Sequence, residues 1–275
     1  MTTDFADSKA QVLPAPAYDA GSVAVVTGSA SGIGRVIAET LGAQGVAVAV
    51  LDVNATGANE TRDLILGRGG KAIAVTCDVS SEDAVAKAET AVTGQLGPAS
   101  IVVNNAGFLR AMPLDELTLA DWNAVLGVNL TGYFLCAKIF GKAMRAQGKG
   151  AFVHIGSIAS QFAQTRGGAY SAAKAGICGL SSTIAAEWGP LGIRSNVVHP
   201  GLIRTPLSEP FYQDPQLAAR RERTIASRRA GAPRDIADVV AFLASDRAAY
   251  VNGSELTVDG GFSRMAIDLI PRPGF

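Results

Sequence analysis

The residues best placed to do chemistry are Tyr170 and Lys174, four positions apart in Tyr170-Ser-Ala-Ala-Lys174, with Ser157 upstream of them. On a helix, side chains four residues apart share a face, so the ammonium of Lys174 can lie beneath the phenol of Tyr170. A nearby cation favours the phenolate, and we therefore expect the pKa of Tyr170 to fall below its ordinary value of about 10. Tyr170 could then act as a base toward an alcohol and as an acid toward a carbonyl. Ser157 would donate a hydrogen bond to the substrate oxygen.

A glycine-rich turn, Thr27-Gly-Ser-Ala-Ser-Gly-Ile-Gly34, supports the catalytic interpretation of Tyr170 and Lys174. The support is needed because a Tyr-x-x-x-Lys pair alone also arises by chance. Thr27-Gly28 closes a predicted strand and Gly32-Ile33-Gly34 opens the next helix. Such a turn lets the backbone approach a pyrophosphate at the positive end of the helix. The same spacing also occurs in turns that bind nothing. Taken with the tyrosine and the lysine, the turn predicts hydride transfer on a nicotinamide dinucleotide.

Asp52 bears on which dinucleotide is used. It ends the second predicted strand, where a carboxylate can accept hydrogen bonds from both adenosine ribose hydroxyls. Its charge would repel a 2′-phosphate, and neither Ser31 nor Val53 is basic, so NAD is predicted over NADP. Arg35 is the reservation, although we expect its side chain to face solvent or the sheet edge. Asp52 could also be merely a turn residue at the end of a strand.

The composition favours a single soluble domain. The 275 residues are 48% hydrophobic and 17% charged, which suffices for one large core without disulfides or metals, and no metal site is predicted. Lys plus Arg and Asp plus Glu number 24 each, so no overall field recruits nucleic acid or an anionic membrane. Three widely spaced cysteines are typical of reduced thiols in a cytoplasmic protein.

The chain ends carry separate expectations. Residues 1–20 lack the basic start and apolar core of a secretion signal, and we expect them to form a flexible arm. The longest apolar run, Val46 to Leu51, is too short to cross a bilayer. The tail from about 263 to 275 mixes apolar residues with two prolines, so docking at a subunit interface is the hypothesis for it.

From Ser22 onward, short runs of Val, Ile and Ala alternate with longer helical stretches, a pattern typical of strands buried on both faces of a parallel sheet. The predicted strands are Val23–Val26, Val46–Asp52, Ala72–Cys77, Ile101–Asn104, Ala151–Ile155, Arg194–Val198 and Glu255–Val258. We therefore expect an α/β fold: a single doubly wound Rossmann-type domain over residues 21–275, with a seven-stranded parallel sheet flanked by helices.

Local signals also mark helix ends. Ser80 with Asp83, and Thr118 with Asp121, have the spacing of a capping box, and Gly97 followed by Pro98 should end the first of these helices.

With these motifs in place, the chain resembles the short-chain dehydrogenase/reductase family from about Ser22 to about Phe262. The motifs that carry the resemblance are Thr27–Gly34, Asp52, Asp78-Val79, Asn104-Asn-Ala-Gly107, Asn129, Ser157, Tyr170 with Lys174, Pro200-Gly201 with Thr205, and Val258-Asp-Gly-Gly261.

The resemblance implies roles for residues that spacing alone leaves unexplained. Asp78 and Val79 would contact the adenine, and Asn105, Ala106 and Gly107 would line the cofactor cleft. Asn129 would hold a water that links Lys174 to solvent; without the family, it is as well interpreted as a solvent-facing residue of a long helix. The remaining implied cofactor contacts are Gly28, Ser31, Gly32, Ile33, Gly34, Tyr170, Lys174, Pro200, Ile203 and Thr205, the last bonding the nicotinamide carboxamide.

Three segments should surround the substrate: 108–112, 159–165 and a lid from Leu202 to about Arg228. The arginines of the lid could bind an acidic substrate or form a solvated helix face. Members of the family are commonly tetramers, so a homotetramer is implied.

We therefore expect an NAD-dependent enzyme that interconverts a secondary alcohol and a ketone. The alternatives are an NADPH-dependent 3-oxoacyl thioester reductase and a non-catalytic nucleotide-sensing protein.

Overall fold

A computed structural model describes residues 17–270 of the chain, so most of the predicted N-terminal arm and the last five residues of the tail lie outside the described residues. One parallel sheet organises this part of the molecule. Its strands are β1 (Val23–Thr27), β2 (Ala47–Asp52), β3 (Ala72–Thr76), β4 (Ile101–Asn104), β5 (Gly150–Ile155), β6 (Ile193–Pro200) and β7 (Glu255–Val258). Their order is β3-β2-β1-β4-β5-β6-β7, and every pair is parallel. The predicted doubly wound seven-stranded sheet is confirmed, with strand ends shifted by at most two residues.

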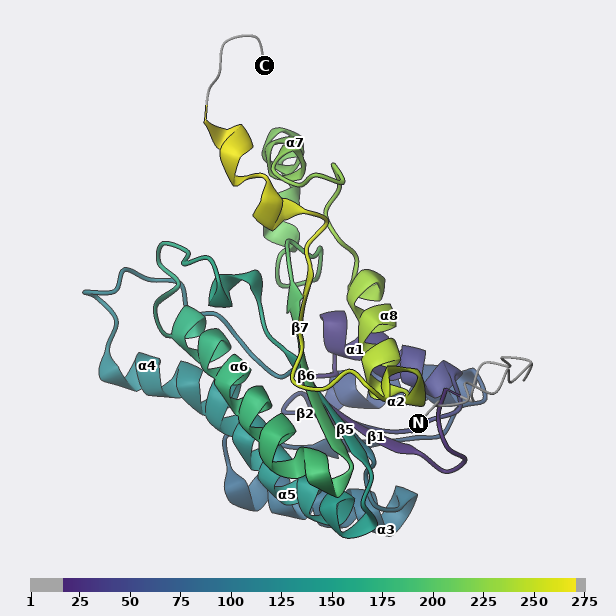
Figure 1. Cartoon of the computed structure of the whole chain (residues 1–275). Coiled ribbons are helices and arrows are strands. Elements are labelled where there is room, and N and C mark those ends of the chain that lie inside the picture. The colour runs from purple at the N-terminus through teal and green to yellow at the C-terminus, as the bar shows by residue number, and fades with distance from the viewer. Residues whose placement is uncertain (1–16, 271–275) are drawn as a thin grey trace, which may run out of the picture.

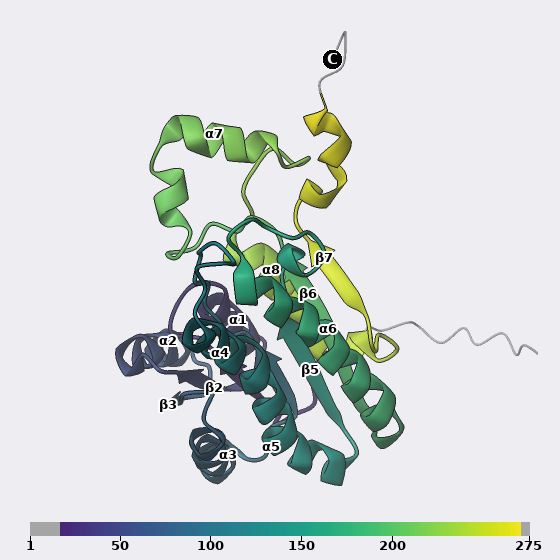
Figure 2. The same cartoon turned by 90° about the vertical axis from the view of Figure 1, so that its left-hand side faces the viewer.

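Helices cover both faces of the sheet (Figures 1 and 2). They are α1 (Gly32–Ala43), α2 (Ala55–Gly67), α3 (Glu82–Leu96), α4 (Leu119–Leu126), α5 (Gly132–Gln147), α6 (Gly168–Trp188), α7 (Pro215–Arg223) and α8 (Pro233–Ala244). Helices α1, α2 and α8 pack on one face, and α3, α5 and α6 on the other. Helix α7 and the segment after β7 project beyond the rest of the molecule in both views.

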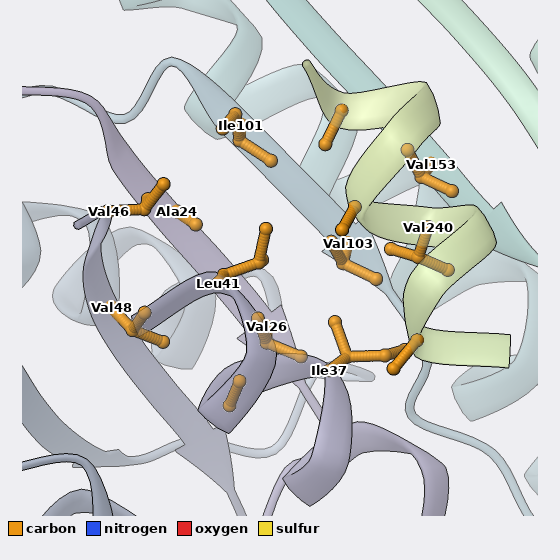
Figure 3. Close-up of a cluster of buried hydrophobic side chains, with 14 of the residues drawn as sticks. Ala24, Val26, Ile37, Leu41, Val46, Val48, Ile101, Val103, Val153 and Val240 are labelled. Atoms are coloured by element: carbon orange, nitrogen blue, oxygen red, sulfur yellow. The ribbon is translucent and has the colours of Figure 1, made fainter. Parts of the chain in front are cut away.

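The core forms because consecutive strand residues face opposite sides and both sides are covered. In Figure 3, Val26 and Val103 of the sheet meet Ile37 and Leu41 of α1 and Val240 of α8. All five side chains are fully buried. This packing fixes the carboxyl ends of the central strands, where the loops of the site begin.

The helix ends follow the predicted signals with one exception. Thr118 accepts a hydrogen bond from the Asp121 amide, and α3 ends at Gly97, as predicted. The cap of α3 is Ser81, not Ser80, because the Ser80 hydroxyl donates to the Asp78 carboxylate at 2.7 Å. Ser81 instead accepts from the Ala84 amide.

Helices α4 and α5 are joined by a π-helical turn, Gly127–Thr131, so that the chain from Leu119 to Gln147 runs as one long rod. Among residues 17–270, this rod is long and apolar enough to span a membrane by length and composition. Half of its most apolar window is buried inside the protein, as is common for a core helix.

Candidate active site

The predicted site residues gather at the carboxyl ends of the strands, around the point between β1 and β4 where the winding of the sheet reverses. The turn after β1 and the loop after β4 are tied together there. The Asn105 side chain donates to the carbonyls of Thr27 and Gly28, both at 2.9 Å. The Thr27 hydroxyl accepts from the amides of Asn105 and Ala106, both at 3.0 Å. The glycine-rich turn is therefore held by main-chain and amide contacts.

The three positions of the turn require glycine for different structural reasons. A Cβ on Gly28 would lie 2.6 Å from Ala106 Cα, and one on Gly34 would lie 2.3 Å from the Gly28 carbonyl oxygen, so packing of the protein itself excludes side chains at both. Gly32 has a φ of +56°, which favours glycine, and a Cβ there would touch the Thr205 side chain at an ordinary contact distance of 3.8 Å. The turn thus lies directly beside the loop after β6.

The amino end of α1, which begins at Gly32, suits a diphosphate. Among the described residues no side chain caps α1 at Ser31, and its first turn holds no acidic residue. Free amides at a helix start favour an anion. The residues present therefore fit the dinucleotide that the sequence implies.

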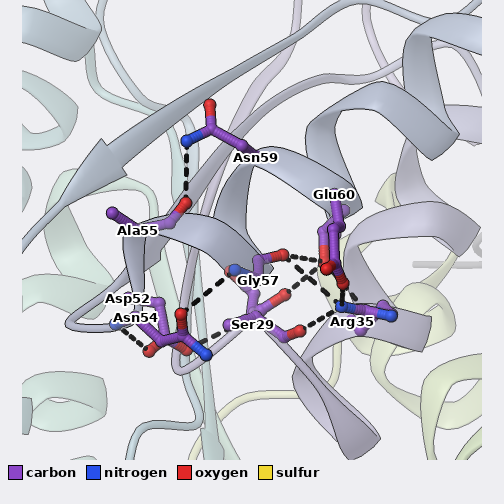
Figure 4. Close-up of polar contacts among 10 residues, drawn as sticks. Ser29, Arg35, Asp52, Asn54, Ala55, Gly57, Asn59 and Glu60 are labelled. Atoms are coloured by element: carbon purple, nitrogen blue, oxygen red, sulfur yellow. Dashed lines mark hydrogen bonds and ion pairs between the residues drawn. The ribbon is translucent and has the colours of Figure 1, made fainter.

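Asp52 lies at the end of β2, close to this turn (Figure 4). One carboxylate oxygen accepts from the Ala30 amide and the other from the Asn54 amide, both at 2.9 Å. Arg35 does not face solvent or the sheet edge as predicted. Its guanidinium pairs with Glu60 at 2.8 Å and donates to the Thr61 hydroxyl at 3.0 Å, because α2 packs directly against the turn. The positive charge of Arg35 is therefore already paired.

The other predicted cofactor contacts border the same cleft. Val79 is buried against Gly132, whereas Asp78 is exposed and accepts from the Ser80 amide. After β6, Ile203 is buried, and the Thr205 amide donates to the Ser208 hydroxyl at 2.9 Å. Pro200 ends β6 itself. Gly107 lies against the Asn129 side chain.

Lys174 is the buried charge of the site. Its side chain is 3% exposed, and Nζ lies 5.7 Å from the centre of the Tyr170 ring, so the two share a face of α6 as predicted. The ammonium donates to the Ile155 carbonyl at 2.7 Å and to the Tyr133 hydroxyl at 3.1 Å. Burial lowers the pKa of Lys174 to about 7.

The prediction that the protein's own residues lower the pKa of Tyr170 is wrong. Burial raises the pKa of Tyr170, and the Ser157 hydroxyl offsets only part of this by hydrogen bonding to the phenol. The hydrogen bonds of Lys174 go to other oxygens, which leaves desolvation as the larger effect. Tyr170 is therefore held protonated, next to Ser157.

Asn129 is fully buried, which contradicts the interpretation of it as a solvent-facing residue. It sits in the π-helical turn between α4 and α5. Its side-chain amide accepts from the Phe108 amide at 3.0 Å and donates to the Phe108 carbonyl at 2.9 Å. Asn129 thereby fixes the loop after β4, one of the segments predicted to surround the substrate.

Two residues of the site escaped the sequence analysis. Tyr133 is buried under Lys174, and its hydroxyl donates to the Ile155 carbonyl at 3.1 Å. His199 is fully buried at the end of β6, where its Nδ1 lies 3.2 Å from the Ser157 amide nitrogen. Its place immediately before Pro200-Gly201 was a signal for proximity to the site, whereas Tyr133 had none in the sequence.

The predicted lid contains a 3-10 turn, Glu209–Tyr212, and α7. Leu207 and Phe211 are exposed, and Tyr212 is buried with the guanidiniums of Arg204 and Arg221 over its ring. The predicted lid thus exposes apolar side chains to solvent. A cavity of about 540 Å³ lies elsewhere, at the amino ends of the strands, and holds none of the predicted residues.

Comparison with known proteins agrees with this geometry. Residues 28–263 match the model of the family described as enoyl-(acyl carrier protein) reductase. D-threitol dehydrogenase of Mycolicibacterium smegmatis is 40% identical over 243 residues, covering 88% of this chain and 93% of the relative. A 3-oxoacyl-[acyl-carrier-protein] reductase of Synechocystis is 38% identical over 241 residues, covering 87% and 96%.

A solved structure has the same fold. A gluconate 5-dehydrogenase from Burkholderia cenocepacia, in complex with NADP and tartrate, is 31% identical with a TM-score of 0.85 and covers 90% of this chain and 98% of its own. The chain is thus an oxidoreductase that uses a nicotinamide dinucleotide, and it belongs to the short-chain dehydrogenase/reductase family.

Proposed function

We propose that the protein is an NAD-dependent dehydrogenase that interconverts a secondary alcohol and a ketone. The observation that carries the reaction is the grouping of Tyr170, Ser157 and the buried Lys174 at the carboxyl edge of the sheet. The relatives named as dehydrogenases of hydroxylated compounds support this substrate class.

The chain's own residues account for the proton transfer. Tyr170 is held protonated by burial, so in the reducing direction its phenol donates the proton to the carbonyl oxygen as charge develops there. The Ser157 oxygen accepts from the Ala159 amide at 3.0 Å, so the hydroxyl keeps its proton for donation. With substrate bound, that proton would turn from the Tyr170 phenol to the substrate oxygen. The bound dinucleotide supplies or accepts the hydride.

Lys174 and Asn129 support this chemistry. Two of the three protons on Lys174 are fixed by Ile155 and Tyr133, and we propose that the third contacts the nicotinamide ribose. In the oxidising direction the Lys174 ammonium would favour the phenolate, as would the positive charge that an oxidised nicotinamide supplies when bound, and Tyr170 would accept the alcohol proton. Asn129 holds the Phe108 backbone, and a water beside it would complete the proton path.

The preference for NAD rests on Asp52. Its carboxylate is anchored by two main-chain amides and would face the adenosine ribose, where it repels a 2′-phosphate. Arg35, the basic residue that the sequence raised in favour of NADP, is paired with Glu60. Adenine contacts from Asp78 and Val79, cleft contacts from Ala106 and a carboxamide contact from Thr205 complete the proposed binding mode.

Two other functions are compatible with parts of the same site. An NADPH-dependent 3-oxoacyl thioester reductase fits the same catalytic group and is represented among the relatives, but the Asp52 carboxylate disfavours its cofactor. A nucleotide-sensing protein without turnover would have no use for the buried Lys174 beside Tyr170.

The decisive experiment is a panel of secondary alcohols, beginning with D-threitol and cyclic alcohols, with NAD and with NADP, followed by absorbance of the reduced nicotinamide. Tyr170→Phe should lower kcat by roughly 10²- to 10⁴-fold, because general acid–base catalysis is removed. The affinity for NADH should stay within about twofold, since the phenyl ring remains. Turnover that survives in the variant, or none in the wild type with cofactor bound, would refute the proposal.

Asp52→Ala separates NAD from NADP. Removal of the carboxylate should lower the ratio of kcat/KM for NAD over NADP by roughly tenfold, equivalent to 1.4 kcal/mol. Val53→Ala is the matched control, because the Val53 side chain is 67% exposed beside Asp52. An unchanged ratio in Asp52→Ala would refute the role of Asp52, whereas a wild-type preference for NADPH favours the thioester reductase.

We further propose a cytoplasmic homotetramer. The three cysteines are free thiols, as expected in a reducing compartment. Between α5 and α6, the exposed Phe134 borders a small cavity of about 170 Å³ lined by Leu180 and Trp188, a surface suited to a subunit contact. Light scattering of the purified chain tests the assembly.

A further inference from the structure

We infer that Cys178, His199 and Glu255 form a binding site for a divalent zinc-class cation. The three residues come from α6, the end of β6 and the start of β7, and their ligand atoms all lie within 4.8 Å of one another. A thiol, an imidazole and a carboxylate are the ligand types that zinc combines in proteins. None of the three is needed for the proton transfer described above.

The distances suit a single ion. His199 Nε2 lies 2.9 Å from a Glu255 carboxylate oxygen and 3.8 Å from Cys178 Sγ. Zinc bonds of about 2.0–2.3 Å in a tetrahedron place neighbouring ligand atoms roughly 3.4–3.6 Å apart. The two distances from His199 Nε2 therefore need to change by about half an ångström or less, and the Cys178–Glu255 pair, which lies within 4.8 Å, by at most about 1.2 Å. The Glu255 side chain is 36% exposed, so solvent can reach the site and supply a fourth ligand.

The other nitrogen of His199 is already placed as in a metal site. Nδ1 lies 3.0 Å from the Ser157 carbonyl oxygen, so a proton on Nδ1 can be donated there. In that tautomer the lone pair of Nε2 points at the thiol and the carboxylate. Metal-bound histidines commonly donate their second N–H to a carbonyl in this way. When the cation binds, the Cys178 thiol releases its proton to solvent and Sγ forms the bond to the metal.

The site is coupled to the catalytic serine through one imidazole ring. Nδ1 also lies 3.2 Å from the Ser157 amide, a hydrogen bond that requires Nδ1 without its proton. A cation on Nε2 fixes the opposite tautomer and so removes this bond. Cation binding should therefore disturb Ser157 and lower kcat. This second part rests on the proposed function, whereas binding itself does not.

Cobalt titration of the full chain without an affinity tag tests the site. Co²⁺ should bind with one equivalent and a near-ultraviolet thiolate-to-cobalt band, and Zn²⁺ should displace it. Cys178→Ser should abolish the band, and Glu255→Gln, on the accessible side, should weaken Zn²⁺ binding by at least about tenfold. Cys77→Ser is the matched control, because Cys77 is a buried thiol outside the cluster and should leave the band intact.

Absence of the band in the wild type, or its persistence in Cys178→Ser, would overturn the site. Turnover measurements test the coupling separately: Zn²⁺ should lower kcat of the wild type and not that of Cys178→Ser. A kcat that stays constant while the cobalt band saturates would overturn the link to Ser157. Since the titration needs no turnover, failure of the proposed function would leave the test of binding unaffected.

Discussion

The two ends of the active cleft are held together by different kinds of interaction. At the nucleotide end, the turn after β1 is held by neutral main-chain and amide contacts from Asn105 and by glycines that allow close approach. At the catalytic end, the Lys174 ammonium is 3% exposed and donates to two neutral oxygens. The structure of the nucleotide end depends on close packing, whereas that of the catalytic end depends on a buried charge. The two should therefore respond differently to pH and to substitution.

The largest effect is expected at the catalytic end. Lys174→Met should lower kcat by about 10²- to 10⁴-fold, because the group that supports Tyr170 is lost. It should also change how stability depends on pH. Folded Lys174 has a pKa of about 7, against an ordinary lysine value of 10.5. Between these two pH values the unfolded chain binds more protons, so the stability of the wild type rises with pH.

The burial penalty is thus full below about pH 7 and is relieved above it. From pH 7 to pH 9 the free energy of unfolding of the wild type should rise relative to that of Lys174→Met by about 2 kcal/mol, because the slope of 1.36 kcal/mol per pH unit is reached only above the folded pKa. Urea unfolding at a series of pH values measures this difference. Lys138→Met, at an exposed lysine paired with Glu82, is the control and should show no such slope. A pH-independent difference for Lys174→Met would mean that the ammonium is not desolvated.

Substitutions at the nucleotide end should instead destabilise the protein through steric overlap. Gly34→Ala places a methyl group 2.3 Å from the Gly28 carbonyl oxygen, and the backbone of the turn must move to relieve the clash. We expect a loss of about 1–3 kcal/mol in the free energy of unfolding, with little dependence on pH. The KM for NAD should rise as the turn is displaced.

Gly179→Ala is the matched control for this change. Gly179 lies inside α6, and a Cβ there would meet no atom within 4 Å. The control should be stabilised by about 0.5–1 kcal/mol, because alanine favours the helix. Equal effects of the two substitutions, measured by thermal unfolding, would show that the turn is not closely packed.

The same contrast explains which parts of the site the sequence could predict. The strands were predictable because residues buried on both faces form continuous apolar runs, and the glycine turn was predictable because its spacing is local. Tyr133 and His199 were not, since their partners Lys174 and Ser157 lie 41 and 42 residues away. The interpretation of Asn129 as solvent-facing, made without the family resemblance, was wrong because a π-helical turn, which the sequence does not mark, directs the side chain inward.

The pKa of Tyr170 shows a further limit. Spacing correctly placed Lys174 beneath the ring, but the net shift depends on burial and on where the ammonium directs its hydrogen bonds. Neither quantity is local in the sequence. A motif can therefore name the reacting groups while leaving their protonation to tertiary structure.

The smallest effect is expected for Tyr133, whose hydroxyl contacts Lys174 at the catalytic end. Tyr133→Phe removes the hydroxyl that accepts from Lys174 and donates to Ile155, and it should cost about 1–2 kcal/mol of unfolding free energy because both partners lose a buried hydrogen bond. Tyr212→Phe is the matched control, since that hydroxyl is buried without a partner in the described residues and its removal should cost nothing. Chemical denaturation at pH 7 compares the two. If both variants lose stability, the loss does not come from the hydrogen bonds of Tyr133. If only Tyr133→Phe loses stability, the neutral oxygen of Tyr133 stabilises the buried ammonium of Lys174.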